Sequence, residues 1–369
     1  MIVKRKSAEP PKATCQESFP RTHICAIGLS CATGDQPFAL FGAVGTNLSC
    51  AIPHPVLAVA GMDGEDAAAL YAPVPGLEPY VSREERIAAM AVEALGCALD
   101  ACPEGLLGQK TLVFTWLPVM AEEDVADLEA LLRQELPALE NATLHFVQGE
   151  EGVVAALKSL CKELASGRWE AVIFGGSDSL VGSESCRELL QQGRLMAPHC
   201  AEGVFPGEAA AYLVLRADHA GAKAPKSKAV ITSASQAPEP FARQGGEKKM
   251  TGLAQALGEA ADQGGIRLDE VAELILTLST ETTSQLEWHQ TLMRLWPPRG
   301  TEDSRDQHLL RLHPTLGELG AATLPVALTL GCARFEFEHP PLAAILVGEG
   351  GDAPVRGAVC LSAPRSDVP

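Results

Sequence analysis

The sequence predicts an α/β protein made of two similar halves, in each of which helices cover a mixed sheet. Short apolar segments of strand length alternate with amphipathic helical segments along most of the chain. The same alternation recurs on both sides of a low-complexity stretch at residues 218–228. Hydrophobic residues make up 46% of the 369 residues and charged residues 21%, which is typical of a globular protein with a large core.

The first half is predicted at residues 21–217, after a polar, proline-containing N-terminal arm at residues 1–20. Its longest helix is expected at residues 83–102, where apolar side chains recur at the spacing of one helix face. The segment 152–167 is also amphipathic and ends at a glycine, as helices commonly do. In order, the predicted elements are a strand and turn at 23–34, a helix at 83–102, a strand at 111–118, a helix at 125–136, a strand at 142–148, a helix at 152–167, and strands at 169–176 and 207–217.

The second half is predicted at residues 229–369, with residues 218–228 as the crossover linker between the halves. Residues 297–313 are polar and predict an exposed excursion. The expected elements are a strand at 229–236, a helix at 252–263, a strand at 271–279, helices at 286–296 and 321–335, and strands at 342–348 and 357–363.

Composition excludes several classes of function. The chain has 29 Lys and Arg against 47 Asp and Glu, and a net charge of −18 argues against a nucleic-acid or anionic-membrane surface. The 11 cysteines are irregularly spaced and form no CxxC pair, so we expect free thiols in a reducing cytoplasm and no zinc site. There is no apolar run suited to a signal peptide or membrane helix. We therefore expect a cytoplasmic protein without cofactor, metal or membrane insertion.

Four segments carry a family resemblance. They are CATGDQPFALFGAVGTNLS (31–49), GGSDSL (175–180), the stretch 191–215 with its PGEAAA turn, and GEGGDAP (348–354). In this order and spacing they resemble the β-ketoacyl synthases of the thiolase fold. The resemblance implies a thiolase-like α/β fold of two similar halves, with layered mixed sheets covered by helices.

The positions that the resemblance marks as catalytic have lost their chemistry. In the family, a nucleophilic Cys stands at a strand-to-helix elbow, where the helix N-terminus stabilises its thiolate. Here that position is Gly149, or Gln148 if the register shifts by one residue. The two expected histidines are replaced by Leu278 and by Gly317, which precedes Glu318, and the gating Phe of the last loop is replaced by Glu349. We expect a pseudoenzyme without condensing activity.

The remaining candidates are assigned to a pocket or interface. Glu150 and Glu151 would stabilise the dipole at the start of the following helix, and they could also block the former acyl pocket. Gln148 and Glu318 complete this candidate set. Cys161 lies in the middle of a helix and is expected to pack in the core. The sequence shows no Ser-His-Asp signature, P-loop or dinucleotide fingerprint.

Two functions remain open. The first is a cytoplasmic adaptor, chaperone or scaffold for a protein partner, such as an effector or secretion component, because degenerate ketosynthase-like proteins accompany bacterial type VI secretion genes. The alternative is a subunit similar to a chain-length factor, silent itself and paired with an active ketosynthase in fatty-acid or polyketide synthesis. Gln148 favours the alternative, whereas a charge at Glu349 beside an acyl tunnel opposes it. In both cases the strand at 142–148 is expected to pair two subunits, as a homodimer or with a related chain.

Overall fold

A computed structural model describes eleven parts of the chain: residues 19–60, 65–78, 81–103, 107, 110–149, 152–197, 200–218, 225–241, 249–297, 308–337 and 342–364. Of the expectations above, those for Glu150 and Glu151, for most of the N-terminal arm and for much of the linker fall outside these residues. No helix in the described part is long and apolar enough to cross a membrane.

The strands of the first half form one side of a ten-stranded mixed sheet. They are β1 (Thr22–Cys31), β4 (Thr111–Leu117), β5 (Thr143–Gln148), β6 (Ala171–Ser179) and β7 (Glu208–Ala217). Their spatial order is β1-β7-β6-β4-β5. The β1–β7 and β7–β6 pairs are antiparallel, whereas the β6–β4 and β4–β5 pairs are parallel.

The second half repeats this arrangement. Its strands are β8 (Ala229–Pro238), β9 (Glu273–Leu276), β10 (His308–Arg311), β11 (Ala344–Glu349) and β12 (Val355–Ser362). Their order, β8-β12-β11-β9-β10, has the same sequence of two antiparallel and two parallel pairs. The two halves are joined where Thr22, His23 and Ile24 of β1 pair with β8. The predicted duplication of the α/β unit is therefore present in the strand order itself.

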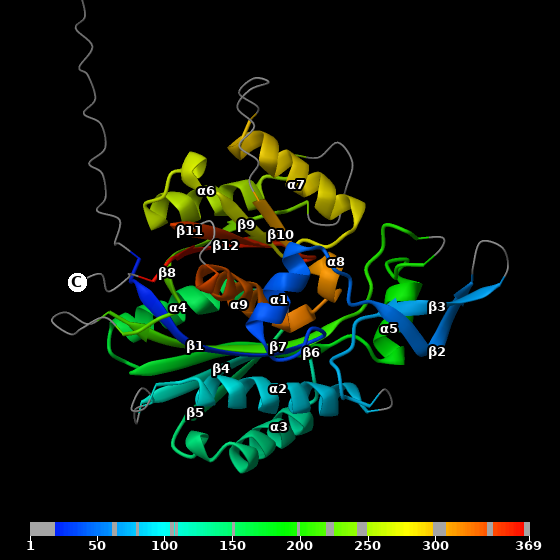
Figure 1. Ribbon diagram of the computed structural model, residues 1–369, viewed down its shortest axis with the longest axis horizontal. Helices are drawn as coiled ribbons and strands as arrows, with labels where there is room; N and C mark the ends of the chain where they lie inside the picture. The colour runs from blue at the N-terminus through cyan, green and yellow to red at the C-terminus, as the bar shows by residue number, and fades with distance from the viewer. Residues whose placement is uncertain are drawn as a thin grey trace, which may run out of the picture.

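Helices fill and cover the space around the two halves (Figure 1). Between them lie α4 (Val153–Ala165) and α9 (Thr323–Glu336), each of which contacts strands of both halves. Because α9 is covered on both sides, every residue from Leu324 to Arg334 is buried. The first half is covered on its outer face by α2 (Arg83–Asp100) and α3 (Glu122–Glu135), and the second by α6 (Gly252–Gly264) and α7 (Thr282–Leu295). The layered α/β fold class is confirmed.

Several elements were not predicted. They are α1 (Pro37–Gly45) as a defined helix, the hairpin β2 (Ile52–Ala60) and β3 (Asp66–Tyr71), α5 (Ser183–Gln191), β10, α8 (His313–Leu316), and the short 3₁₀ turns η1 (Pro137–Leu139), η2 (Leu268–Glu270) and η3 (Gly320–Ala322). The prediction that residues 297–313 form an exposed excursion is wrong for the last residues of this range. Leu310, Leu312 and His313 are buried there, because β10 adds a strand to the sheet and α8 packs beneath it.

Strand β5 lies at one end of the strand order. One edge pairs with β4, and no strand in the described ranges pairs with the other. Thr143, His145 and Gln148 are exposed, while Leu144 and Phe146 pack against the cluster beneath α2 and α3. An apolar and aromatic strand therefore presents free backbone donors and acceptors at the rim of the sheet.

Candidate functional site

A cavity of about 570 Å³ lies where the two halves meet at the N-terminus of α4. Its wall is formed by residues 149 and 152–153 before and in α4, by residues 277 and 279 after β9, by residues 313–321 around α8 and η3, and by residues 349–353 after β11. Of the four positions that the resemblance marked as catalytic, Gly149 and Glu349 line the cavity, whereas Leu278 and Gly317 do not.

Gly149 occupies the elbow at the end of β5. Its φ of +118° and that of Gly152, +88°, are conformations that only glycine adopts without strain. The elbow is held by a hydrogen bond from the Gly149 N–H to the Leu117 carbonyl (3.0 Å) and by the Trp116 indole N–H, which donates to the Gly149 carbonyl. Gly149 lines the cavity and contributes no side chain to it.

Gln148 has a different environment from Gly149. It is exposed and does not line the cavity, and its side-chain carbonyl accepts a hydrogen bond from the Met120 N–H (3.1 Å). The sequence left two alignments open, with either Gly149 or Gln148 at the nucleophile position. In the structure Gly149 lies at the cavity wall, and Gln148 lies at the end of the edge strand β5.

Gly317 cannot carry a side chain in this fold. It ends α8 with a φ of +77°, and a Cβ atom there would lie 2.5 Å from the Phe205 carbonyl oxygen. The Glu318 N–H donates to that same carbonyl, so the contact is part of the backbone pairing of this turn. A histidine at position 317 would therefore displace the chain segment that forms the cavity wall.

Leu278 also lies outside the cavity. It is 3% exposed and packs in the core cluster that contains Leu276 and Trp288. Thr277 and Ser279, which come directly before and after Leu278 in the sequence, line the cavity instead. The wall at this point offers hydroxyl groups where the family resemblance implied an imidazole.

His313 is the functional side chain that the sequence analysis missed. It is 4% exposed, lines the cavity, and neither ring nitrogen has a hydrogen-bond partner. Its Nδ1 atom lies 3.7 Å from Oε2 of Glu318, which is too long for a hydrogen bond. A histidine four residues before Gly317 was the available signal, but it stands in a stretch that was predicted to be exposed.

Glu349 lines the cavity, and its carboxyl group has a raised pKa. Burial raises the pKa of its carboxyl group to about 8, and the nearby Arg356 only partly offsets this rise. The Arg356 guanidinium is held by two hydrogen bonds to Glu287, at 2.7 and 3.0 Å. A raised pKa favours the protonated carboxyl group at Glu349, which can both donate and accept a hydrogen bond.

Two further acidic residues have structural roles. Asp178, at the cavity wall, pairs with Arg83 (2.8 Å) and accepts the Ala321 N–H (3.0 Å), which ties η3 to β6. Glu208 is completely buried and receives two hydrogen bonds from Arg86, at 2.5 and 2.7 Å. Neither geometry leaves a free carboxylate for proton transfer.

Cys161, which the sequence analysis considered, and His289 lie away from the cavity. Cys161 is completely buried, and burial raises the pKa of its thiol to about 12. His289 is exposed on α7 and hydrogen-bonds the Gln285 carbonyl (2.6 Å). Ten cysteines in the described part are free thiols, and no cluster there could hold a metal ion.

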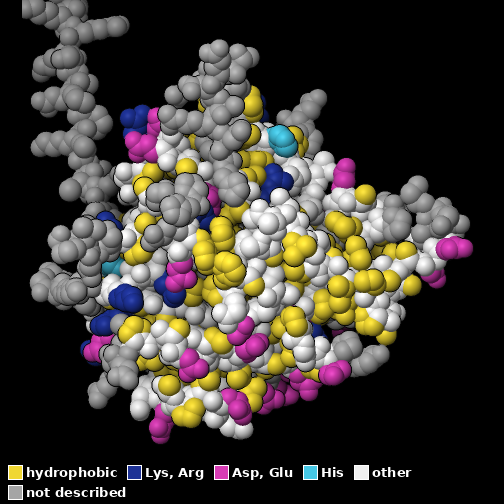
Figure 2. Space-filling model, in the orientation of Figure 1, with side chains coloured by type: hydrophobic (Ala, Val, Ile, Leu, Met, Phe, Trp, Pro, Cys, Tyr) yellow, Lys and Arg dark blue, Asp and Glu magenta, His cyan; other side chains and the backbone are white. Residues whose placement is uncertain are grey.

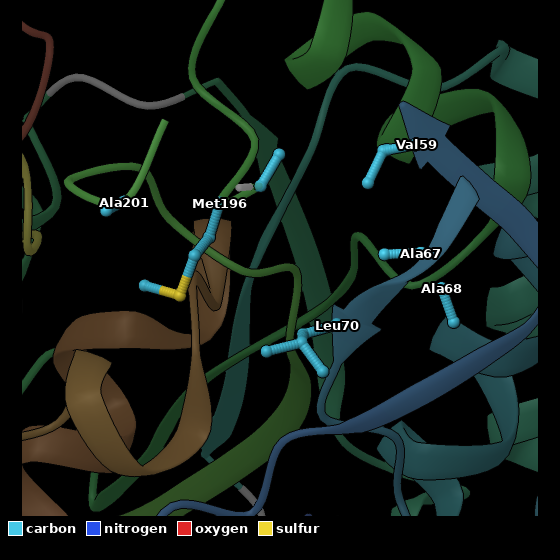
Figure 3. Close-up of a pocket in the computed structure, with 7 residues that line it drawn as sticks. Val59, Ala67, Ala68, Leu70, Met196 and Ala201 are labelled. Carbon is cyan, nitrogen blue, oxygen red and sulfur yellow. The ribbon is translucent and has the colours of Figure 1, made fainter. Parts of the chain in front are cut away.

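A second hollow, of about 390 Å³, lies beside the β2–β3 hairpin. Figure 3 shows Val59, Ala67, Ala68 and Leu70 of the hairpin on one side, and Met196 across from them. Its lining is apolar and carries no titratable side chain. Hydrophobic side chains also gather on the surface over this hairpin in Figure 2. Ile52 and Val56 of β2 are exposed. The hollow can make apolar contacts only.

Comparison with known proteins gives the fold a family context. No protein-family model and no curated protein matches the sequence. Among solved structures, the ishigamide ketosynthase/chain length factor superposes with a TM-score of 0.68 at 17% identity, and a β-ketoacyl synthase from Burkholderia phymatum STM815 with 0.70 at 13%. A type II PKS ketosynthase, solved with its acyl-carrier protein and bound to the hexaketide, gives 0.73 at 12%. Each match covers 94% of this chain and 100% of the other. The chain has the thiolase-like fold of the ketosynthases.

Proposed function

We propose that the chain is a non-condensing protein of ketosynthase fold that acts by binding, as the partner of an active ketosynthase in the manner of a chain-length factor. One observation carries the proposal. The 570 Å³ cavity persists at the N-terminus of α4, but the residue at its elbow is Gly149, which has no side chain to attack a thioester.

The other positions that the resemblance marked as catalytic also support a loss of condensing activity. Gly317 has no room for an imidazole, and Leu278 packs in the core. His313 reaches the cavity, yet a single histidine without a nucleophile cannot form the acyl-enzyme that condensation needs. These residues could bind a ligand but could not join two acyl groups.

A second subunit could join the chain by pairing with β5. The free edge of β5 can extend the sheet into another subunit by antiparallel pairing. Both a second copy of this chain and a related ketosynthase-fold chain would fit the same edge. Because the chain carries −18 net charge, an acidic acyl-carrier protein would dock on the partner rather than on this subunit.

A second candidate is an adaptor for a protein partner, such as a type VI secretion effector. The polar lining of the cavity favours it, since Thr277, Ser279, Glu318 and His313 are poor neighbours for an acyl chain. In either role we propose that the chain works in the cytoplasm, where its free thiols would stay reduced.

Affinity capture from the native cells tests the proposal. The tagged chain is captured alongside a variant with Thr143→Lys and His145→Lys, which adds two charges to the exposed face of β5. Gln134→Lys with Ala138→Lys is the matched control, because both residues are exposed and away from that edge. We expect a ketosynthase to be captured by the wild type and the control and lost from the β5 variant. An effector or secretion component as the main captured protein would replace this proposal by the adaptor role.

A condensation assay tests the loss of chemistry separately. The purified chain is incubated with acyl and malonyl thioesters, and carbon–carbon bond formation is followed by mass spectrometry. We expect no β-ketoacyl product. Turnover to such a product by the chain alone would refute the assignment as a non-condensing protein.

A further inference from the structure

Three side chains outside the cavity form a hydrogen-bonded relay where β1 begins. The Nε2 atom of His23 lies 2.6 Å from Oδ1 of Asp218, and its Nδ1 atom lies 3.1 Å from Oγ of Ser227. Asp218 and Ser227 lie 195 and 204 residues from His23 in the sequence, so no local motif could reveal the set. None of the three lines the cavity at α4.

The directions of the two hydrogen bonds depend on the tautomer of His23, and one tautomer of the neutral ring suits both of its partners. An ionised carboxylate can only accept, so the Nε2–H of His23 donates to Asp218. The neutral ring then carries its lone pair on Nδ1, which accepts the hydroxyl proton of Ser227. The order of the three groups is that of a nucleophile, a base and an orienting carboxylate, with the two ring nitrogens in exchanged places relative to the usual triad.

The burial of the groups suits these roles. His23 is 5% exposed and is held from both sides, whereas the side chain of Asp218 is 44% exposed and Ser227 is partly exposed. The base is thus fixed in the protein while the hydroxyl group remains within reach of a substrate. Strand pairing also places Arg216 of β7 directly opposite His23, which adds a positive charge to the neighbourhood.

We propose that Ser227 is a nucleophile for activated acyl groups, with His23 as its general base and Asp218 as the residue that positions the base. Thioesters and aryl esters are the expected substrate class, because their leaving groups depart without strong assistance. The positive charge of Arg216 would favour the anionic tetrahedral intermediate. This activity would be hydrolytic and distinct from the proposed pairing with a ketosynthase.

The reaction balances with water as the only co-reactant. The Ser227 oxygen bonds to the acyl carbon while its proton moves to Nδ1 of His23. The carbon–sulfur bond then breaks, and the thiol leaves with that proton. Water attacks the resulting serine ester, His23 takes and returns its proton, and the carboxylic acid is released with Ser227 restored.

A fluorophosphonate probe tests the nucleophile on the full chain, and peptide mass spectrometry locates the adduct. We expect an adduct at Ser227 that Ser227→Ala abolishes. The control variant Ser166→Ala should keep it, since the Ser166 hydroxyl only donates to the Glu163 carbonyl. The same variants are assayed with an aryl acetate for release of the phenol. Absence of an adduct at Ser227 in the wild type would overturn the proposal.

Two further variants test the relay itself. His23→Gln should slow labelling at Ser227 by about 100-fold or more, which is the usual contribution of a general base. Asp218→Ala should slow it by at least about 10-fold because the ring is no longer held in the required tautomer. Asp218 is at the surface, so this variant folds even if His23→Gln does not. An unchanged labelling rate in Asp218→Ala would also overturn the proposal.

Discussion

Glu349 should make the stability of the protein depend on pH, and Glu349→Gln should remove that dependence. Burial raises the pKa of its carboxyl group from 4.5 to about 8. Between these values the folded protein keeps the proton and the unfolded chain has lost it, so the free energy of unfolding falls as pH rises. At about 1.4 kcal/mol per pH unit, the loss reaches about 3 kcal/mol at pH 7 and about 4 kcal/mol at pH 8, where the folded group is itself half ionised.

Urea unfolding at pH 5, 6, 7 and 8 measures this contribution. Glutamine has the shape of the protonated carboxyl group and no titrating proton. The free energy of unfolding of the variant should therefore increase relative to that of the wild type as pH rises. Burial also raises the pKa of Glu287, which holds Arg356, but that residue is present in both proteins and its contribution cancels. Glu188→Gln is the control, because Glu188 lines the same cavity with an exposed side chain. A stability difference that stays constant from pH 5 to pH 8 would refute the reasoning.

Three other outcomes follow from the contacts described above. Glu208→Leu should lower the free energy of unfolding in urea by about 3–5 kcal/mol, because it leaves the Arg86 charge buried and unpaired. Adding Arg86→Met should recover much of this loss. If the losses of the two single variants simply add in the double variant, the reasoning is contradicted. Gly317→Ala should cost about 2–5 kcal/mol through its φ and its contact with Phe205, whereas an effect below about 0.5 kcal/mol would show that the turn can yield. Cys161 should resist iodoacetamide until the protein unfolds, and rapid alkylation in the native state would show that α4 opens.

Much of the fold was predictable because its strands and helices bury whole faces. The helix expected at 83–102 is α2 (Arg83–Asp100), whose apolar stripe packs on the sheet and whose start is a capping box between Ser82 and Glu85. The β2–β3 hairpin was missed because most of β2 is exposed and carries no alternating apolar pattern. Strand β10 was missed because four residues after a polar stretch are too few to show a period.

The candidate site was only partly predictable. The resemblance to β-ketoacyl synthases pointed to Gly149, Glu318 and Glu349, and all three line the cavity. The protonation state of Glu349 depends on its enclosure and could not be deduced from sequence. His313 and the relay around His23 escaped notice because their meaning comes from neighbours that the topology brings together.

The two edge strands of the ten-stranded sheet differ in length, and this difference affects how copies of the protein can assemble. A sheet that offered long pairing edges at both ends could add subunits without limit and grow into fibres. Here β5 offers six residues at one end, whereas β10 offers four at the other. Pairing of β5 with β5 of a second copy uses the long edge of both molecules at once and leaves only the two short ends outermost. If copies of the chain pair in this way, they would form a closed pair and not an open filament.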